Sequence, residues 1–132
     1  MHADQRDRRE FYRFPASGEA VVICDRDRTV SEIAGRLVDV SCGGVALVVP
    51  TRLEVGAHVS LVLINPLDGS EVRLEGCVRH VQPVDDGQYR LGFCLSARLS
   101  PQDVVAFSLT ALASLVRSEF LFPPTGATLV GR

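Results

Sequence analysis

The chain has 132 residues, of which 46% are hydrophobic and 23% charged, a length and balance that indicate one globular domain and exclude a disordered or fibrous chain. Its formal net charge of −2 at pH 7 argues against general nucleic-acid binding, which usually requires a clustered basic face. The sequence has no apolar stretch of the roughly 18 to 20 residues that cross a bilayer, and its four cysteines form no CxxC pair, which disfavours a structural zinc site.

The N-terminal segment is polar and rich in arginine. It is charged from residue 4 to residue 10 and lacks the apolar core of a secretory signal, so we expect a cytoplasmic protein with reduced cysteines. Arg8, Arg9 and Arg13 can fork onto phosphate oxygens and stack on a purine. Nearby acids keep the net charge of the segment small, which suits a small ligand with few phosphates. The alternative for this cluster is an ordinary solvated charge run.

The first strand is predicted after this segment. Proline and glycine in residues 14–18 should interrupt any regular element, so residues 1–17 are expected to form an arm that is mobile without ligand. Residues 19–24 are rich in valine and isoleucine and predict a strand, and the charged residues 25–28 predict its turn.

The second notable phrase reads Asp39-Val40-Ser41-Cys42-Gly43-Gly44. Alternation along a strand would place Asp39 and Ser41 together on the outer face of the sheet. The Asp39 carboxylate can accept two hydrogen bonds from the N1-H and N2-H₂ edge of guanine. Gly43 and Gly44 permit positive φ and let the backbone approach a ligand closely. The alternative is an ordinary tight turn between two strands.

The rest of the chain predicts further antiparallel strands. Hairpin turns are expected at residues 65–69 and 85–87. Gly76 and Gly92, inside predicted strands, indicate bends or bulges. About six strands at this spacing predict a barrel or a sandwich. After the strand near residue 39, the apolar or alternating segments that predict strands are residues 45–49, 59–63, 72–79 and 89–95.

A helix is predicted at the C-terminal end. Ser100 is a capping residue and Pro101 suits the first helical position. An apolar stripe should lie on the sheet or cap the barrel, and Phe107 and Leu115 widen it. The apolar tail beyond the helix is expected to pack back on the barrel or to contact another chain. The stripe consists of Val105, Leu109, Leu112 and Val116.

Together these motifs resemble a known family. Arg9 and Arg13 match RxxxR, and Asp39, Ser41 and Gly44 match [D/N]xSxxG, the paired motifs of the PilZ domain, a bacterial receptor module for cyclic di-GMP. The likeness continues through residues 73–80 and 89–93. It implies an all-β fold with a C-terminal helix, built on a six-stranded antiparallel β-barrel of the split-barrel type. The implied organisation is an arm at residues 1–17, the barrel at residues 18–98, and a helix and tail of the same domain at residues 99–132.

The resemblance also implies a function. The arginines would clasp phosphates and guanine, Asp39 and Ser41 would read a guanine edge, and the arm would close over the barrel and signal to a protein effector in trans. A basic residue at Arg8 implies an intercalated dimer of cyclic di-GMP, with two molecules per chain. No cofactor, metal, nucleic acid or membrane insertion is implied. The full ligand-binding set is Arg8, Arg9, Arg13, Asp39, Ser41, Cys42, Gly43 and Gly44.

Two other interpretations remain open. A PilZ-like protein-interaction adaptor that does not bind the nucleotide would use the apolar C-terminal end. A small split-barrel enzyme that binds flavin would need a phosphate cradle, which the sequence lacks. His2, His58 and His80 are scattered, and there is no P-loop, GxGxxG or nucleophile elbow. We therefore expect a binding module and no catalytic residues.

Overall fold

The computed structural model describes residues 12–26 and 29–116, with side chains described up to residue 109. Within these residues the chain forms strands, one short 3-10 turn and a C-terminal helix. No helix among the described residues is long and apolar enough to span a membrane. The elements are β1 (Phe14–Pro15), β2 (Glu19–Arg26), β3 (Thr29–Val40), β4 (Gly44–Val49), β5 (His58–Ile64), β6 (Glu71–Pro83), η1 (Asp85–Gly87), β7 (Tyr89–Leu95) and α2 (Pro101–Val116).

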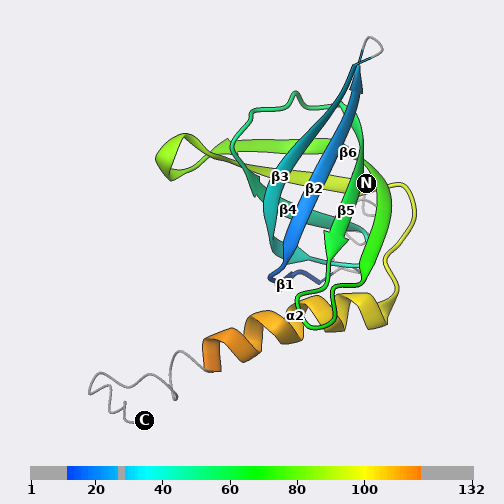
Figure 1. Ribbon diagram of the computed structural model, residues 1–132, viewed down its shortest axis with the longest axis vertical. Coiled ribbons are helices and arrows are strands. Elements are labelled where there is room, and N and C mark those ends of the chain that lie inside the picture. Colours follow the sequence, from blue (N-terminus) through cyan, green and yellow to red (C-terminus); the bar gives the residue numbers. More distant parts are fainter. Residues whose placement is uncertain (1–11, 27–28, 117–132) are drawn as a thin grey trace, which may run out of the picture.

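Six of the strands close into an antiparallel barrel, as predicted. The sheet order is β3-β2-β5-β6-β7-β4, and β4 pairs back with β3 to complete the circle. Closure is possible because β3 is 12 residues long: its first part pairs with β2 and its last part with β4. Figure 1 shows the barrel above α2, with the β6–β7 hairpin projecting to one side.

The core of the barrel comes from alternate residues of each strand, the pattern expected where one face is buried and one is wet. On β4 even the outward positions Ala46 and Val48 are buried. β4 is therefore the most enclosed strand of the described sheet. The fully buried side chains are Val22, Val40, Val45, Leu47, Val49, Leu61, Leu63, Val78 and Leu91.

β1 is an addition to the barrel that the sequence did not predict. Phe14 lies opposite Val40 and Pro15 opposite Asp39, and the Ala16 amide donates to the Val38 carbonyl at 3.2 Å. The expected break in this stretch is therefore wrong at Phe14–Pro15. A two-residue strand with a neighbour on one side only tolerates proline. As a result, the end of the predicted arm is attached to the barrel beside Asp39.

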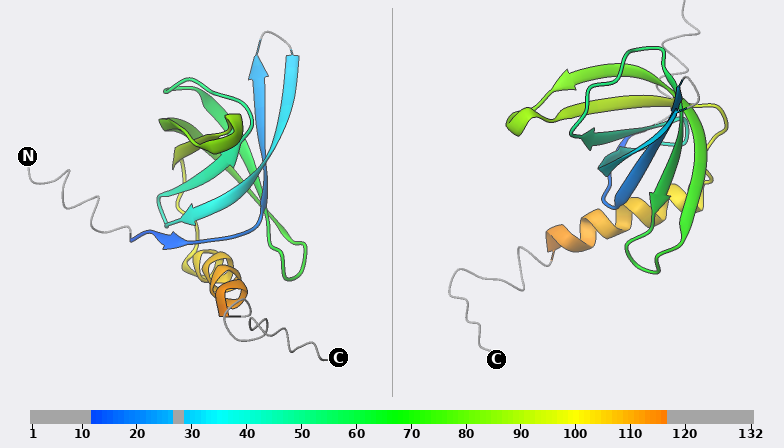
Figure 2. Two further views of the ribbon diagram at one scale, coloured as in Figure 1. Left: turned by 90° about the vertical axis from the view of Figure 1, so that its left-hand side faces the viewer. Right: turned by 45° about the horizontal axis from the view of Figure 1, so that its top comes forward.

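Helix α2 begins as predicted but presents a different face to the barrel. The Asp103 amide donates to the Ser100 hydroxyl at 3.1 Å, which confirms the cap. Val104 is buried and Phe107 is only 1% exposed, whereas Val105 and Leu109 are 52% and 53% exposed. The predicted stripe is thus wrong at Val105 and Leu109. The helix packs through its first two turns at the barrel end (Figure 1), which agrees with the predicted alternative that it caps the barrel. Figure 2 shows that its C-terminal half extends past the barrel.

One of the two bulges lies beside a glycine that suggested it, and neither lies at the other glycine. The register shifts lie between Leu37 and Asp39 and between Val78 and His80. Gly76 instead allows close strand packing, because a Cβ there would lie 2.9 Å from the Cys94 carbonyl oxygen. The prediction of a bulge is therefore wrong at Gly76, whereas the shift between Val78 and His80 on β6 lies opposite Phe93 and Gly92 of β7.

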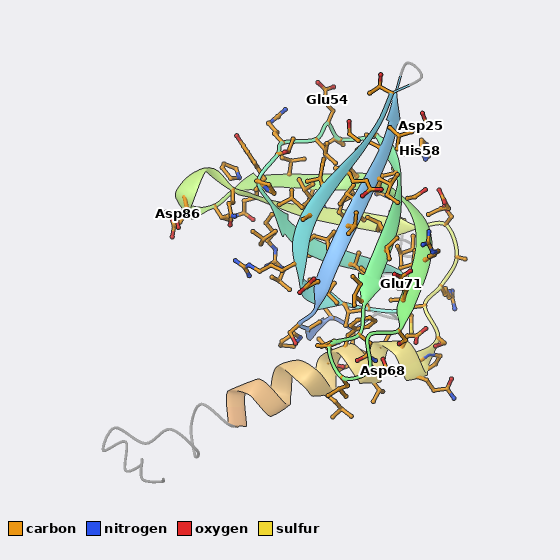
Figure 3. The ribbon with its side chains drawn as sticks, viewed as in Figure 1. Asp25, Glu54, His58, Asp68, Glu71 and Asp86 are labelled. Atoms are coloured by element: carbon orange, nitrogen blue, oxygen red, sulfur yellow. The ribbon has the colours of Figure 1, made fainter. Side chains whose placement is uncertain are left out.

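The predicted turn at residues 65–69 is confirmed. The Asn65 side chain accepts the Leu67 amide at 2.8 Å, and the Gly69 amide donates to the Asn65 carbonyl. Asp68, labelled in Figure 3, accepts the Ser70 amide at 2.9 Å. This hydrogen bond holds the pKa of Asp68 below its usual value. The side chains of this turn therefore stabilise it locally.

Candidate functional site

A row of four residues crosses the outer face of the barrel. Asp39 on β3 lies opposite Ala46 on β4, Ala46 opposite Gly92 on β7, and Gly92 opposite His80 on β6. Directly opposite residues in antiparallel strands point to the same side of a sheet. The two central residues, Ala46 and Gly92, have a methyl side chain and no side chain, respectively. The surface along the row is therefore lower in the middle than at Asp39 and His80, which have larger side chains.

The low centre of this row is the floor of a surface hollow of about 290 Å³. Arg90 and Gln82 lie opposite each other in the next row and form another part of its wall. Arg13, just before β1, closes the side next to β3. The lining residues are Arg13, Ala46, His80, Gln82, Arg90 and Gly92, and we call this space the arginine hollow.

Asp39 holds the two arginines of this hollow. Its Oδ2 atom lies 3.3 Å from Arg13 Nη1 and 3.2 Å from Arg90 Nη2. The Asp39 side chain is 13% exposed, and its Oδ1 atom is buried with no hydrogen-bond partner among the described residues. A buried carboxylate oxygen without a partner is unusual in a native protein. The site thus carries an acceptor that a ligand donor could satisfy.

The two ion pairs position the guanidinium groups without fixing them firmly. Both arginine side chains are partly exposed, and ion pairs open to solvent contribute only about 0 to 1 kcal/mol. Redirecting Arg13 and Arg90 onto an anion would therefore cost the guanidinium groups little, provided that a ligand donor replaces them at the largely buried Asp39 carboxylate. Arginine presents several N–H donors in a planar fork, which matches phosphate and the edge of a purine.

Ser41 is not presented beside Asp39 on a strand. β3 ends at Val40, and the Ser41 hydroxyl accepts the Gly44 amide at 3.0 Å and donates to the Gly44 carbonyl at 3.2 Å. The side chain is 4% exposed. The expectation that Asp39 and Ser41 share an open strand face is wrong here, because the hydroxyl closes the turn that leads into β4.

Gly44 is required by a neighbouring strand. A Cβ there would lie 2.6 Å from the Phe93 carbonyl oxygen on β7, and its φ lies outside the left-handed region. Of the two expected reasons for this glycine, positive φ is therefore wrong, and close approach to a ligand stays a prediction. The sequence motif instead selects a residue without a side chain so that β4 and β7 can approach.

Gly44→Ala is expected to destabilise the fold by about 1 to 3 kcal/mol, because the new Cβ meets a backbone oxygen that cannot move alone. Urea unfolding of the variant measures this. Gly92→Ala is the matched control, since a Cβ there lies 3.4 Å from His80 side-chain atoms, which can shift. Equal unfolding midpoints for Gly44→Ala and the wild type would contradict this role.

The other motif residues act through the backbone or lie outside the described residues. The Cys42 carbonyl accepts the Leu99 amide at 2.9 Å, and the Gly43 carbonyl accepts the Leu95 amide at 3.0 Å. These bonds attach the turn to the last residue of β7 and to the segment that follows it. Arg8 and Arg9 lie outside the described residues.

Arg90, His80 and Gln82 were not among the predicted site residues. Alternation on β6 and β7 could have placed them on the outer face. What the sequence could not supply is the pairing of β4 with both β3 and β7, which brings Arg90 to Asp39 across 51 positions. Among the described residues, no group of three or more histidine, cysteine or acidic side chains could hold a metal ion.

Comparison with known proteins gives the family. A model of the PilZ domain matches residues 7–114. The PilZ domain of YcgR from Escherichia coli, solved with c-di-GMP, is similar with a TM-score of 0.61 and 20% identity, over 85% of this chain and 98% of that one. None of the curated proteins compared with the chain matches it.

Two longer solved chains share the fold. The inhibitor of motility MotI/DgrA from Bacillus subtilis gives a TM-score of 0.55 at 16% identity, over 83% of this chain and 52% of that one. The K. pneumonia MrkH-c-di-GMP complex gives 0.55 at 18% identity, over 84% and 53%. The chain spans about half the length of these two. Since the family model covers most of the sequence and the barrel agrees with it, the chain belongs to the PilZ domain family.

Proposed function

We propose that this protein is a receptor for cyclic di-GMP and that the ligand binds over the arginine hollow. The observation that carries the proposal is the meeting of Arg13 and Arg90 at Asp39, whose second carboxylate oxygen has no partner in the described structure. The solved YcgR domain and the MrkH complex, which contain c-di-GMP, support the choice of ligand.

Each group in the hollow has a suitable role. The Asp39 carboxylate would accept hydrogen bonds from the N1-H and N2-H₂ edge of a guanine. Arg13 and Arg90 would leave Asp39 for phosphate oxygens or for a guanine face. Gly92 and Ala46 leave the floor free for a flat base. A binding site of this kind needs no catalytic group, and we propose a receptor without enzymatic activity.

The size of the hollow favours a second wall supplied by the ligand-bound arm. Its volume of about 290 Å³ is at the lower end of the roughly 300 to 1,000 Å³ of small-molecule sites. We propose that the segment carrying Arg8 and Arg9 closes over the nucleotide, with an intercalated dimer of two molecules as the bound form. Ordering each arm residue costs about 1 to 2 kcal/mol, so ligand contacts must exceed that sum. The new position of the arm over the nucleotide would be recognised by a protein effector in the cytoplasm.

Calorimetric titration tests the proposal. Cyclic di-GMP is expected to bind the wild type, with saturation at two molecules per chain, and GTP and linear pGpG to bind far more weakly. Absence of heat at tens of micromolar, a level equal to about 6 to 7 kcal/mol of binding free energy, would contradict the receptor function. That result would favour the interaction adaptor, whose surface would be sought at the exposed Val105 and Leu109 of α2.

Arg90→Ala and Arg13→Ala are each expected to weaken binding about 10- to 100-fold, since hydrogen bonds to charged groups contribute about 1.5 to 3 kcal/mol. Arg73→Ala is the matched control. Arg73 is also an exposed arginine paired with a carboxylate, at 3.2 Å from Glu71, but it does not line the hollow. Equal losses for all three variants would point to general charge attraction and not to a built site.

A further inference from the structure

Two of the four cysteines face each other across adjacent strands. Cys77 on β6 lies directly opposite Cys94 on β7. Cys24 lies opposite Ser31, and Cys42 lies in the turn after β3. All four are free thiols. The barrel thus brings together one specific pair that is separated by 17 positions in the sequence.

The spacing of this pair suits a disulfide. The Ser96 amide donates to the carbonyl of Glu75 at 2.8 Å, so these two opposite residues form a hydrogen-bonded pair. Hydrogen-bonded and non-hydrogen-bonded pairs alternate along antiparallel strands. Cys77 and Cys94 lie two residues further along their strands and are therefore also a hydrogen-bonded pair. The Cα atoms of such pairs are about 5.5 Å apart. Disulfides join Cα atoms that are about 4.4 to 6.8 Å apart, most often near 5.5 to 6 Å. The Cα spacing of such a pair therefore falls in the disulfide range, and the bond forms when the two Cβ atoms draw together to about 3.8 Å.

Both thiols lie on the outer face and are open to reagents. Their strand neighbours Gly76, Val78, Phe93 and Leu95 are buried in the barrel, so the two cysteines point away from the core. Cys94 is exposed and Cys77 is partly buried. On the other side of Cys77, the next residue in this row is His58 of β5, which Figure 3 labels on the surface.

We infer that Cys77 and Cys94 form a dithiol that a hydroperoxide converts into a disulfide between β6 and β7. Thiolate attack by Cys94 on a peroxide oxygen breaks the O–O bond and gives a sulfenic acid and hydroxide. Cys77 then attacks the Cys94 sulfur. The S–S bond forms, the S–O bond breaks, and the released hydroxide takes a proton. Two thiols and one hydrogen peroxide yield one disulfide and two waters, and the peroxide receives the two electrons.

The order of the two roles follows from exposure. Cys94 is the accessible thiol and meets the oxidant first, because oxidation follows thiolate character and access. Cys77 is the resolving thiol, since it already lies opposite. In a reducing compartment such a bond is transient, and thiol exchange restores the dithiol. The pair is therefore a reversible modification site on the outer face of the barrel.

Peptide mass spectrometry of the whole protein tests this inference without any nucleotide. Trypsin cleaves after arginine and places the four cysteines in four different peptides, with Cys77 in residues 74–79 and Cys94 in residues 91–98. After treatment with hydrogen peroxide at low protein concentration, these two peptides are expected to appear linked, with the protein still monomeric on a non-reducing gel. A phosphine reductant should remove the link.

Variants separate the two roles. Cys77→Ser should abolish the link and leave a sulfenic acid on Cys94 that dimedone traps. Cys24→Ser is the control and should keep the link unchanged. Peroxide treatment of the wild type that gives only over-oxidised Cys94, only linked dimers, or links involving Cys24 or Cys42 would overturn the inference.

Discussion

Asp39→Ala is expected to lower the affinity for cyclic di-GMP by about 100-fold or more, which is about 2.8 kcal/mol. The substitution removes the proposed acceptor for the guanine edge and also leaves Arg13 and Arg90 without the carboxylate that positions them. Hydrogen bonds to a charged group contribute about 1.5 to 3 kcal/mol, and both effects act in the same direction. Calorimetric titration of the variant beside the wild type measures the loss.

The control for this variant is Glu71→Ala, because Glu71 is also a carboxylate paired with an arginine but lies away from the hollow. It should bind as the wild type does. Thermal unfolding of Asp39→Ala checks that the barrel remains folded, since the ion pairs it loses are partly exposed and individually weak. Wild-type affinity in a folded Asp39→Ala protein would remove Asp39 from the site.

Phe107→Ala is expected to destabilise the protein by about 3 to 5 kcal/mol, the usual loss for a buried aromatic residue. Phe107 is 1% exposed and fixes α2 to the end of the barrel. Its carbonyl accepts the Ser17 amide at 3.4 Å, and its ring lies about 3.5 Å from the position of a Gly18 Cβ. The same residue thus connects the helix to the segment between β1 and β2. Urea unfolding measures the change.

Leu109→Ala is the comparison for this prediction. Leu109 lies two residues further along α2 and is 53% exposed, so its loss should change stability by no more than about 0.5 kcal/mol. The sequence stripe predicted the opposite ranking for Leu109. Similar losses in the two variants, or a larger loss for Leu109→Ala, would show that the helix packs through the other face.

The barrel could be predicted from the sequence because its signals are local. Apolar and polar residues alternate along residues 72–79, which predicts a strand from a short stretch of sequence. The turns are likewise predicted from the few residues that form them, at 65–69 and 85–87. Strand β7 was predicted with its observed bounds, Tyr89–Leu95. Strand β1 was missed because two residues, one of them proline, are too short to show an alternation of apolar and polar side chains. Only its pairing with β3 defines it as a strand.

The composition of the site could be predicted only in part. Asp39 and Arg13 were identified and do meet. Arg90 was missed because its contact with Asp39 depends on β4 lying between the two strands. The assignment of Ser41 and Gly44 as ligand contacts stays a prediction, and in the structure each is also engaged within the fold. A short motif indicates which residue types occur at fixed positions. It does not indicate whether those residues contact a ligand or an adjacent strand of the same fold.

Nuclear magnetic resonance of the ¹⁵N-labelled protein during titration with cyclic di-GMP tests the location of the site most directly. Binding at the proposed site is expected to shift the backbone amide signals of the arginine hollow, in residues 39–46, 80–82 and 90–92, and to leave those of β2 and β5, at residues 20–24 and 59–63, in place. Shifts confined to β2 and β5, or no shifts at ligand concentrations that saturate other PilZ receptors, would contradict it.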